Sequence, residues 1–458
     1  MPNSTAICLT LIFCLVVVFT DSTNSSGKIA VGYYMSWSSR NYPHNAVKYE
    51  NLTHIAHAFI WPNRNGSLYI PSGFLYPELV QAAHQKGLLA IVSVGGWGQS
   101  DGFSPMAADS NARRQFVNEL RDFCLRNGYD GADIDWEYPT SSDRVNATLL
   151  FKELREAFNN THPPLTLSIA APATDWQEGY DFSVVKDLVD WIGIMTYDFH
   201  GTWTDHAGHN SPLYAPTSDQ DGSVHQSVQY YLSKEISPQK LCIGLPFYGR
   251  LFNASRLYDR STEGEAISYA DIIAKQDSGW TYHWDSISYV PYITNPSNTQ
   301  LITFDDTISI RHKCDYIKDK NLRGAIIWAL GYDNIGNHQP LLETAGKELG
   351  FTLTYAQELL IGHSAPGYAL QQNYPNPFNS QTVITYAIEQ SPAFVKLTIH
   401  DVLGREVATL ARGWKPPGTY TVVFNPEASL LNPVASGVYL CRLNVNGKSS
   451  AITMLYVK

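Results

Sequence analysis

The stretch DGADIDWEYP, from Asp130 to Pro139, gathers carboxylates at a spacing that could carry chemistry. Asp133, Asp135 and Glu137 are each separated by one apolar residue. Residues two apart in a β-strand point to the same side, so these three share one face. Burial and like charge both favour the neutral form of a carboxyl group, which raises at least one pKa toward neutrality, as a general acid needs. The spacing therefore predicts an acid–base site.

The intervening residues, Ile134 and Trp136, would point the opposite way, toward packed helices. Their apolar character argues against the alternative of a surface strand with solvated acids. A second alternative is a Ca²⁺ or Mg²⁺ site, because three oxygen ligands could gather on one strand. Carboxylates on a single strand wrap a cation poorly without further acids or carbonyls, so we expect no metal ion and no cofactor.

The elements that would position this strand are eight short apolar runs, which alternate with longer amphipathic segments between about Lys28 and Gly350. This order predicts a (β/α)8 TIM barrel, whose catalytic residues sit at the carboxyl ends of the strands. Glu137 is the carboxylate nearest that end. An open doubly wound sheet is the alternative, but no GxGxxG follows the first strand. The runs are KIAVGYYM, THIAHAFI, LLAIVSVGG, GADIDW, LTLSIAAPA, DWIGIMTYDF, LCIGLPFYG and GAIIWALGY.

One of the amphipathic segments is NARRQFVNELRDFCLRNG. We expect a helix with Phe116, Leu120, Phe123 and Leu125 on one face and a stop at Gly128. Farther along, residues 251–304 form a connection too long for a simple loop. Long segments inside a compact domain are usually functional, so we expect a small insertion on the carboxyl-end face of the barrel, before the last strand.

DGADIDWEYP resembles the DGxDxDWE signature of glycoside hydrolase family 18, the chitinase family. The resemblance continues in order over nearly all of residues 28–350, in the segments GYYMSW, AFIWP, SVGGW, MTYDFHG, GLPFYGR and GAIIWAL. An ordered set of this kind is far more specific than one motif.

The resemblance implies a retaining mechanism in which the substrate's own 2-acetamido oxygen attacks the anomeric carbon. Glu137 would protonate the leaving oxygen and then act as base. Asp135 would hold the acetamido N–H and stabilise the oxazolinium intermediate, while Asp133 would share a proton with Asp135. Tyr197 would hydrogen-bond the acetamido carbonyl. The implied substrates are chitin and chitooligosaccharides.

The same resemblance implies a set of substrate-binding residues, whose members are Tyr33, Trp37, Phe59, Gly96, Trp97, Met195, Asp198, Tyr248, Arg250 and Trp328. Core packing is the alternative role for Tyr197, and within this set for Tyr33, Phe59, Met195 and Trp328. We read His200 as structural. A chitin-binding lectin remains an alternative for the whole chain, although lectins of this kind typically lose the acid. An endo-N-acetylglucosaminidase or a peptidoglycan-directed hydrolase also remains open.

Composition narrows the remaining possibilities. The net charge is −10, which disfavours nucleic acid, and aromatic residues make up 12%, which suits a sugar ligand. Residues 1–23 contain an apolar core too short to span a membrane, so we expect a secretory signal peptide and no stable membrane insertion. Lipidation at Cys14 is the alternative.

The cysteines beyond the leader are far apart, so we expect them to be isolated thiols. We also expect the protein to be a monomer.

The segment after Gly350 differs from the preceding residues in its sequence pattern. Residues 351–367 read as a linker, and residues 368–458 show period-two alternation broken by Gly and Pro, which predicts an immunoglobulin-like β-sandwich. QQNYPNPFNS, DVLGREVATL, PPGTYTVVF and ASGVYLCRL resemble the C-terminal sorting domain of the bacterial type IX secretion system, with a match at Asn373–Asn379 and a central turn at Gly404-Arg405. The resemblance implies an extracellular or cell-surface protein that meets this machinery. A carbohydrate-binding module is the alternative.

Overall fold

The computed structural model describes residues 27–216, 219, 221–261, 263–351, 368–388, 392–401, 405–426, 435–446 and 448–457. The chain divides into two compact units, Met1–Thr352 and Leu353–Lys458. The predicted leader, nearly all of the predicted linker and Gly404 of the predicted tail turn lie outside the described residues.

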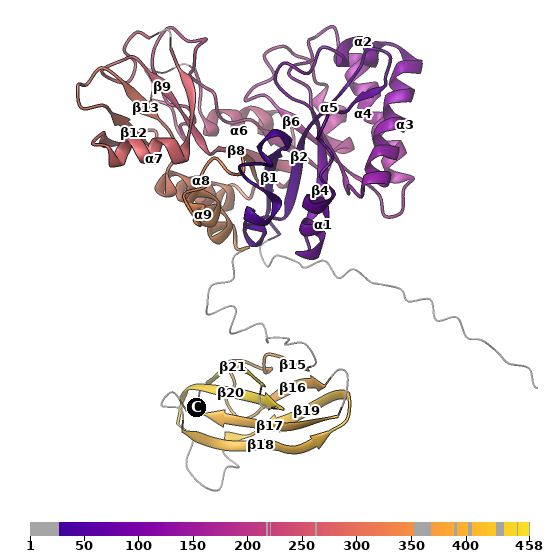
Figure 1. Ribbon diagram of the computed structural model, residues 1–458, viewed down its shortest axis with the longest axis vertical. Coiled ribbons are helices and arrows are strands. Elements are labelled where there is room, and N and C mark those ends of the chain that lie inside the picture. Colours follow the sequence, from indigo (N-terminus) through magenta and orange to yellow (C-terminus); the bar gives the residue numbers. More distant parts are fainter. Residues whose placement is uncertain are drawn as a thin grey trace, which may run out of the picture. The chain divides into compact units, whose positions relative to one another are not determined.

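The first unit is built on a closed parallel sheet. Its hydrogen-bonded order is β1-β14-β8-β7-β6-β5-β4-β2, and β2 pairs with β1 again, which closes the ring (Figure 1). This confirms the predicted (β/α)8 barrel and rules out the open sheet. Each predicted apolar run coincides with one strand, although β2 continues two residues beyond its run. The strands are β1 (Ile29–Met35), β2 (His54–Pro62), β4 (Leu89–Gly95), β5 (Gly131–Asp135), β6 (Thr166–Ala171), β7 (Trp191–Ile194), β8 (Leu241–Pro246) and β14 (Gly324–Trp328).

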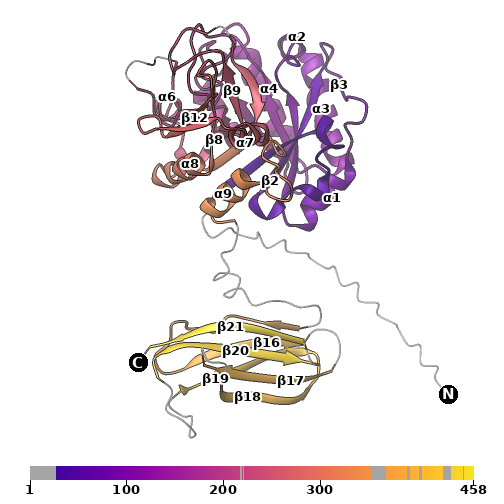
Figure 2. The same ribbon diagram turned by 60° about the vertical axis from the view of Figure 1, so that its left-hand side comes forward.

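Helices surround this ring, as Figure 2 shows from a second direction. The main apolar core lies between strands and helices, and Ile134 and Trp136 belong to it, both at 1% exposure or less. A smaller apolar cluster with Ile91, Ala170 and Ile326 is separate from it. The helices are α1 (Pro77–Gln85), α2 (Phe103–Ala108), α3 (Ser110–Asn127), α4 (Arg144–Asn159), α5 (Phe182–Leu188), α6 (Val224–Ser233), α8 (Thr307–Asp319) and α9 (Pro340–Leu349).

The helix α3 shows how local sequence sets these elements. The Asp109 side chain accepts hydrogen bonds from two backbone N–H groups of its first turn, and Gly128 ends it with a left-handed φ of 75°. Phe116, Leu120 and Phe123 are buried as predicted. Leu125 is 54% exposed, so its placement on that face was wrong. It follows Phe123 by two residues, about 200° around the helix, and therefore faces solvent.

A small sheet is inserted between β8 and α8. Its antiparallel order is β10-β9-β13-β12-β11, and it begins at Tyr248, slightly before the expected boundary. One helix packs with it, and the elements are β9 (Tyr248–Phe252), β10 (Glu265–Ser268), α7 (Tyr269–Asp277), β11 (Thr281–Asp285), β12 (Val290–Thr294) and β13 (Leu301–Thr303). A two-residue strand, β3 (Leu68–Tyr69), pairs with the end of β2.

The second unit consists of antiparallel strands in two sheets. One has the order β15-β16-β19 and the other β18-β17-β20-β21. Both contribute to one apolar cluster that includes Ile384, Leu397, Leu443 and Ile452. Inward and outward residues alternate along these strands, as the period-two pattern predicts. The strands are β15 (Tyr368–Leu370), β16 (Thr382–Ile388), β17 (Ala393–His400), β18 (Glu406–Lys415), β19 (Gly418–Phe424), β20 (Gly437–Val445) and β21 (Lys448–Tyr456).

Cysteines in the described residues are all free and buried, namely Cys124, Cys242, Cys314 and Cys441. Within the same residues, no helix has both the length and the apolarity needed to cross a bilayer.

Candidate active site

The carboxylates of β5 occupy successive levels of one face. Asp133 is 1% exposed, and its carboxylate accepts hydrogen bonds from Ser168 Oγ at 2.7 Å, Tyr33 Oη at 2.8 Å and Ser93 Oγ at 3.0 Å. These donors come from β6, β1 and β4, so three neighbouring strands fix the orientation of one side chain. Burial raises the pKa of Asp133, while the three hydroxyl donors act in the opposite direction by stabilising the carboxylate.

Asp135 is the next carboxylate along the strand and is 4% exposed. Burial raises its pKa well above the usual range, and the charges of Glu137 and Asp133 raise it further. Its Oδ1 atom is buried and has no hydrogen-bond partner among the described residues. A buried acceptor without a partner is costly, so this oxygen is suited to receive a donor from a ligand.

Glu137 lies two residues beyond the end of β5 and is only partly exposed. Burial raises its pKa to about 7, a hydrogen bond from Tyr138 partly opposes this, and the nearby charge of Asp198 adds to it. Its backbone N–H donates to Ser100 Oγ at 3.0 Å, which anchors the end of the strand. A carboxyl group with a pKa near 7 can both give and take a proton close to neutral pH.

Two glycines at the end of β4, Gly95 and Gly96, allow the backbone to approach the end of β5. Gly95 has a φ of 114°, and a Cβ atom there would lie 2.1 Å from the carbonyl oxygen of Asp135. Gly96 has a φ of 88°, donates its N–H to that same oxygen at 2.8 Å, and would push a Cβ atom to 2.7 Å from the Phe59 ring. Only glycine fits these two positions without shifting β5 or Phe59.

A cleft of about 1140 Å³ opens above these carboxylates. Most of the residues predicted for the site line this cleft. They are Trp37, Phe59, Trp97, Asp135, Glu137, Met195, Tyr197, Asp198, Tyr248, Arg250 and Trp328. Asp133, Tyr33 and Gly96 are not part of the lining. They lie against residues that are, since Tyr33 packs edge-on against Trp328 and Gly96 contacts Phe59. Their placement gives them a supporting position.

The cleft has a wall of aromatic side chains that remain unusually open to solvent. Trp97 is 80% exposed, Trp37 is 62% exposed, Trp176 is 58% exposed and Trp203 is 57% exposed. Exposed indole rings lining a concave surface offer flat apolar faces, which suit the apolar faces of sugar rings. Deeper in the cleft, Trp328 stacks on Phe59 with ring centroids 5.6 Å apart and an interplanar angle of 17°.

Several residues of the lining were not predicted from the sequence, namely Trp61, Gln99, Tyr138, Trp176, Trp203 and Gln226. Trp176 and Trp203 lie in loops after β6 and β7, at the barrel face where the carboxylates end. Their position after strand ends is the signal that could have found them, because such loops build the site of a barrel.

Asp198 is held by the inserted sheet. Its Oδ1 accepts from Arg250 Nη2 at 2.5 Å, Tyr248 Oη at 2.7 Å and Arg250 Nε at 3.1 Å. The Arg250 guanidinium also lies 4.8 Å from the centre of the Trp203 ring. Because three donors already engage one oxygen of Asp198, this carboxylate is held in one orientation and is suited to positioning.

The arrangement therefore offers one proton-exchanging carboxyl group at the cleft surface, a second with an unsatisfied oxygen, and a third beneath them. The phenol of Tyr197 lines the same cleft, and its ring meets that of Tyr248 at 6.1 Å. Burial and the surrounding carboxylates raise the pKa of Tyr197, so its hydroxyl remains a donor.

Comparisons with known proteins agree with this geometry. Chitinase A1 of Niallia circulans is 34% identical over 54% of this chain, and the match spans 41% of that protein. Probable chitinase 2 of Drosophila melanogaster is 31% identical, with 68% of this chain and 73% of that protein covered. The crystal structure of the Ostrinia furnacalis Group II chitinase catalytic domain 2 with (NAG)5 superposes with a TM-score of 0.66 at 29% identity, over 70% of this chain and 96% of that one.

The present chain thus spans about two fifths of the length of chitinase A1. The sequence model of the glycosyl hydrolases family 18 matches residues 29–333, which include the whole barrel from β1 through β14. The chain belongs to glycosyl hydrolase family 18.

Proposed function

We propose that this protein is a chitinase that hydrolyses β-1,4-linked N-acetylglucosamine polymers with retention of configuration. The observation that carries the proposal is the pair of carboxyl groups at the end of β5. Glu137 lines the cleft and has a pKa raised to about 7, and Asp135 also lines it with an Oδ1 atom that has no partner among the described residues. Names and ligands of the relatives support the substrate class.

In the first step, the protonated carboxyl group of Glu137 gives its proton to the glycosidic oxygen as the bond to the anomeric carbon breaks. The substrate's acetamido carbonyl oxygen forms the new bond to that carbon and yields an oxazolinium ion. Asp135 accepts a hydrogen bond from the acetamido N–H and offsets the positive charge. Tyr197 donates to the carbonyl oxygen and aligns it for attack.

In the second step, the Glu137 carboxylate removes a proton from water while the water oxygen attacks the anomeric carbon. The oxazolinium ring opens, and the product keeps the starting configuration. Trp328 forms the floor for the reacting sugar, Trp37 and Trp97 bind neighbouring units, and Asp198, Tyr248 and Arg250 contact polar groups. Asp133 shares a proton with Asp135 and thereby tunes the charge of Asp135 during the cycle.

The test is product analysis by mass and anomeric form after incubation of the purified protein with soluble chitin oligosaccharides, with a glycoprotein and peptidoglycan in parallel. We expect shorter oligosaccharides of retained configuration from chitin oligomers. Glu137→Gln should lower turnover by at least about a hundredfold. Cleavage of the glycoprotein alone would indicate an endo-N-acetylglucosaminidase, and cleavage of peptidoglycan alone a peptidoglycan-directed hydrolase.

Binding of chitin oligomers without cleavage of any substrate would indicate a lectin. Inverted products would exclude participation by the acetamido group.

We further propose that the second unit is an immunoglobulin-like sorting domain for type IX secretion, and that the protein acts as a monomer outside the cell. Two antiparallel sheets around one core and the ordered motifs between residues 368 and 458 support this assignment. In a host with this machinery, the full chain should reach the medium or cell surface, while a chain ending at residue 351 should stay in the periplasm. Equal secretion of both forms would contradict the proposal.

A further inference from the structure

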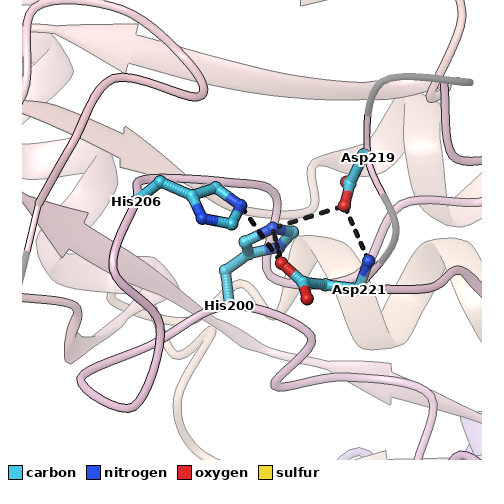
Figure 3. Close-up of side chains that lie close together, drawn as sticks. All are labelled: His200, His206, Asp219 and Asp221. Carbon is cyan, nitrogen blue, oxygen red and sulfur yellow. Dashed lines mark hydrogen bonds and ion pairs between the residues drawn. The ribbon is translucent and has the colours of Figure 1, made fainter.

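Four side chains beside the cleft bring nitrogen and oxygen atoms to one point. His200 and His206 lie in the segment after β7, and Asp219 and Asp221 lie in the segment before α6. Figure 3 shows the imidazole rings and carboxylates converging from opposite sides. One atom from each residue lies within 4.8 Å of the corresponding atoms of the other three. None of these four residues is given a part in the proposed hydrolysis, although Asp221 lines the same cleft as Glu137.

The hydrogen bonds made by Nδ1 of each histidine determine whether Nε2, which faces the cluster, carries a proton. Nδ1 of His200 lies 3.0 Å from the carbonyl oxygen of His209, and Nδ1 of His206 lies 2.9 Å from Oδ1 of Asp205. Both partners only accept hydrogen bonds, so both Nδ1 atoms carry a proton. In the neutral rings, Nε2 therefore presents a lone pair toward the cluster.

The Nε2 lone pairs of both histidines point toward carboxylate oxygens, which are acceptors too. Nε2 of His200 and Nε2 of His206 each lie 3.1 Å from Oδ2 of Asp221, and Nε2 of His200 lies 3.6 Å from Oδ1 of Asp219. An imidazole lone pair and a carboxylate oxygen repel each other at this distance unless a proton or a metal ion lies between them, and one metal ion can serve both imidazoles at once.

Two buried atoms of the cluster also lack partners. Among the residues that the structure describes, neither Nε2 of His200 nor Oδ2 of Asp219 has a hydrogen bond, although His200 is 0% and Asp219 is 4% exposed. Buried polar atoms of this kind are normally satisfied. A metal ion bound within the cluster would satisfy Nε2 of His200, which points toward the other three residues.

We propose that His200, His206, Asp219 and Asp221 form a zinc site. Two imidazole nitrogens and two carboxylate oxygens match the ligand set and number of a closed tetrahedral Zn²⁺ centre. Bonds of about 2.0–2.1 Å place tetrahedral ligand atoms about 3.3 Å apart, and the three separations given above bracket that value. Ca²⁺ and Mg²⁺ prefer oxygen ligands, so the two imidazoles favour zinc.

The ring partners complete the site in the way that zinc centres usually do. A carbonyl or carboxylate that accepts from the far nitrogen orients the imidazole and strengthens it as a ligand. His209 supplies the carbonyl for one ring, and Asp205 supplies the carboxylate for the other. These bonds would hold both rings in the ligating tautomer before the ion arrives.

The site would join two segments of the cleft wall. Thr202 and Trp203, between the two histidines, line the cleft, and Gly222 follows Asp221 in the lining. With four protein ligands, the ion would have no open position and would act as a structural brace. This role differs from the expectation of no metal site that the sequence suggested, because that expectation considered the β5 carboxylates and the cysteines.

The test measures zinc binding to the purified, tag-free full chain after treatment with a chelator. Titration against a chromophoric zinc chelator should show about one tight site per chain. His206→Ala and Asp221→Asn, both at partly exposed positions, should each weaken binding by more than about a hundredfold, and Asp205→Asn by about tenfold. His338→Ala, at an exposed histidine away from the cluster, is the matched control and should bind as the unmodified protein does.

A second readout reports the geometry of the site without reference to activity. Co²⁺ should produce the visible absorption bands of a tetrahedral centre, and these should be lost in His206→Ala but retained in His338→Ala. The zinc proposal is overturned if the unmodified chain binds no zinc at micromolar concentration, or if the cluster variants bind it as tightly as the control. A normal circular-dichroism spectrum and melting curve for each variant establish that lost binding is not lost folding.

Discussion

The hydroxyl group of Tyr33 donates a 2.8 Å hydrogen bond to Oδ2 of Asp133, which joins the first barrel strand to the strand that carries the carboxylates. The sequence left Tyr33 between a pocket role and a packing role. The hydrogen bond gives Tyr33 a third role, because it stabilises the ionised form of Asp133. The charge of Asp133 in turn raises the pKa of the neighbouring Asp135.

Tyr33→Phe should destabilise the protein by about 1–3 kcal/mol, and by more at high pH than at low pH. Burial already raises the folded-state pKa of Asp133, so its contribution to stability is present at low pH and decreases as pH rises through that pKa. Loss of the tyrosine hydroxyl raises the pKa further and enlarges this decrease. Urea denaturation at pH 5 and pH 8 measures the difference.

Tyr34→Phe is the matched control for that experiment. Its hydroxyl donates to the backbone carbonyl of Tyr42 at 2.6 Å, an acceptor that does not titrate. The cost of removing it should therefore stay the same at both pH values. An equal pH response in the two variants would remove Asp133 from the explanation.

Glu137→Gln should become more stable than the unmodified protein as pH rises. The folded-state pKa of Glu137 is raised to about 7, so the ionisation of this group reduces stability between its unfolded pKa, about 4.3, and about 7. Glutamine does not ionise, so the gap should grow over this window and level off above it, at on the order of 3 kcal/mol. Melting temperatures from pH 4 to pH 8 test this, with the exposed Glu156→Gln as control.

The same pKa sets the pH dependence of turnover. The proposed general acid must carry a proton when substrate binds, so kcat/KM should decline as pH rises through about 7. Measurement on a soluble chitin oligomer from pH 5 to pH 9 gives the profile. A rate that keeps increasing up to pH 9 would contradict Glu137 as the acid.

Arg250→Met should destabilise the barrel by about 2–4 kcal/mol, because it leaves the Asp198 carboxylate with a single donor, Tyr248, in place of its paired cation. Asp198→Asn in the same chain should restore part of this loss, since the uncompensated charge is then gone. A double-mutant cycle by urea denaturation gives the coupling energy. Additive effects of the two substitutions would show that the pair contributes no coupling.

Trp97→Ala should raise KM for long chitin oligomers about tenfold and change KM for the shortest cleavable oligomer little. The ring is 80% exposed at the cleft wall, so it can contribute to binding only where a sugar chain extends that far. Trp414→Ala, at an exposed tryptophan of the second unit, should leave both KM values unchanged. A raised KM for polymeric chitin in that variant would favour a carbohydrate-binding module over a sorting domain.

The sequence was sufficient for the barrel because its strands are short and mostly apolar runs. In β5, the alternation of polar and apolar residues was enough to separate Asp133 from Trp136. The loops that line the cleft have no regular alternation of polar and apolar residues. Trp176 and Trp203 reach the cleft through loop conformations that depend on tertiary contacts. The cluster of His200 with Asp221 could not be predicted, because its residues have no motif spacing and meet only after β7 and α6 are packed.

Closure of the ring has a consequence for the order in which the protein can be assembled. Ile29 pairs with Gly324, so β1 keeps one unsatisfied edge until the ribosome has delivered almost the whole first unit. Contacts of such long range form slowly, and open strand edges are prone to aberrant association. A nascent chain of this protein therefore depends on being shielded until β14 arrives, and truncations before Trp328 should yield insoluble fragments rather than smaller enzymes.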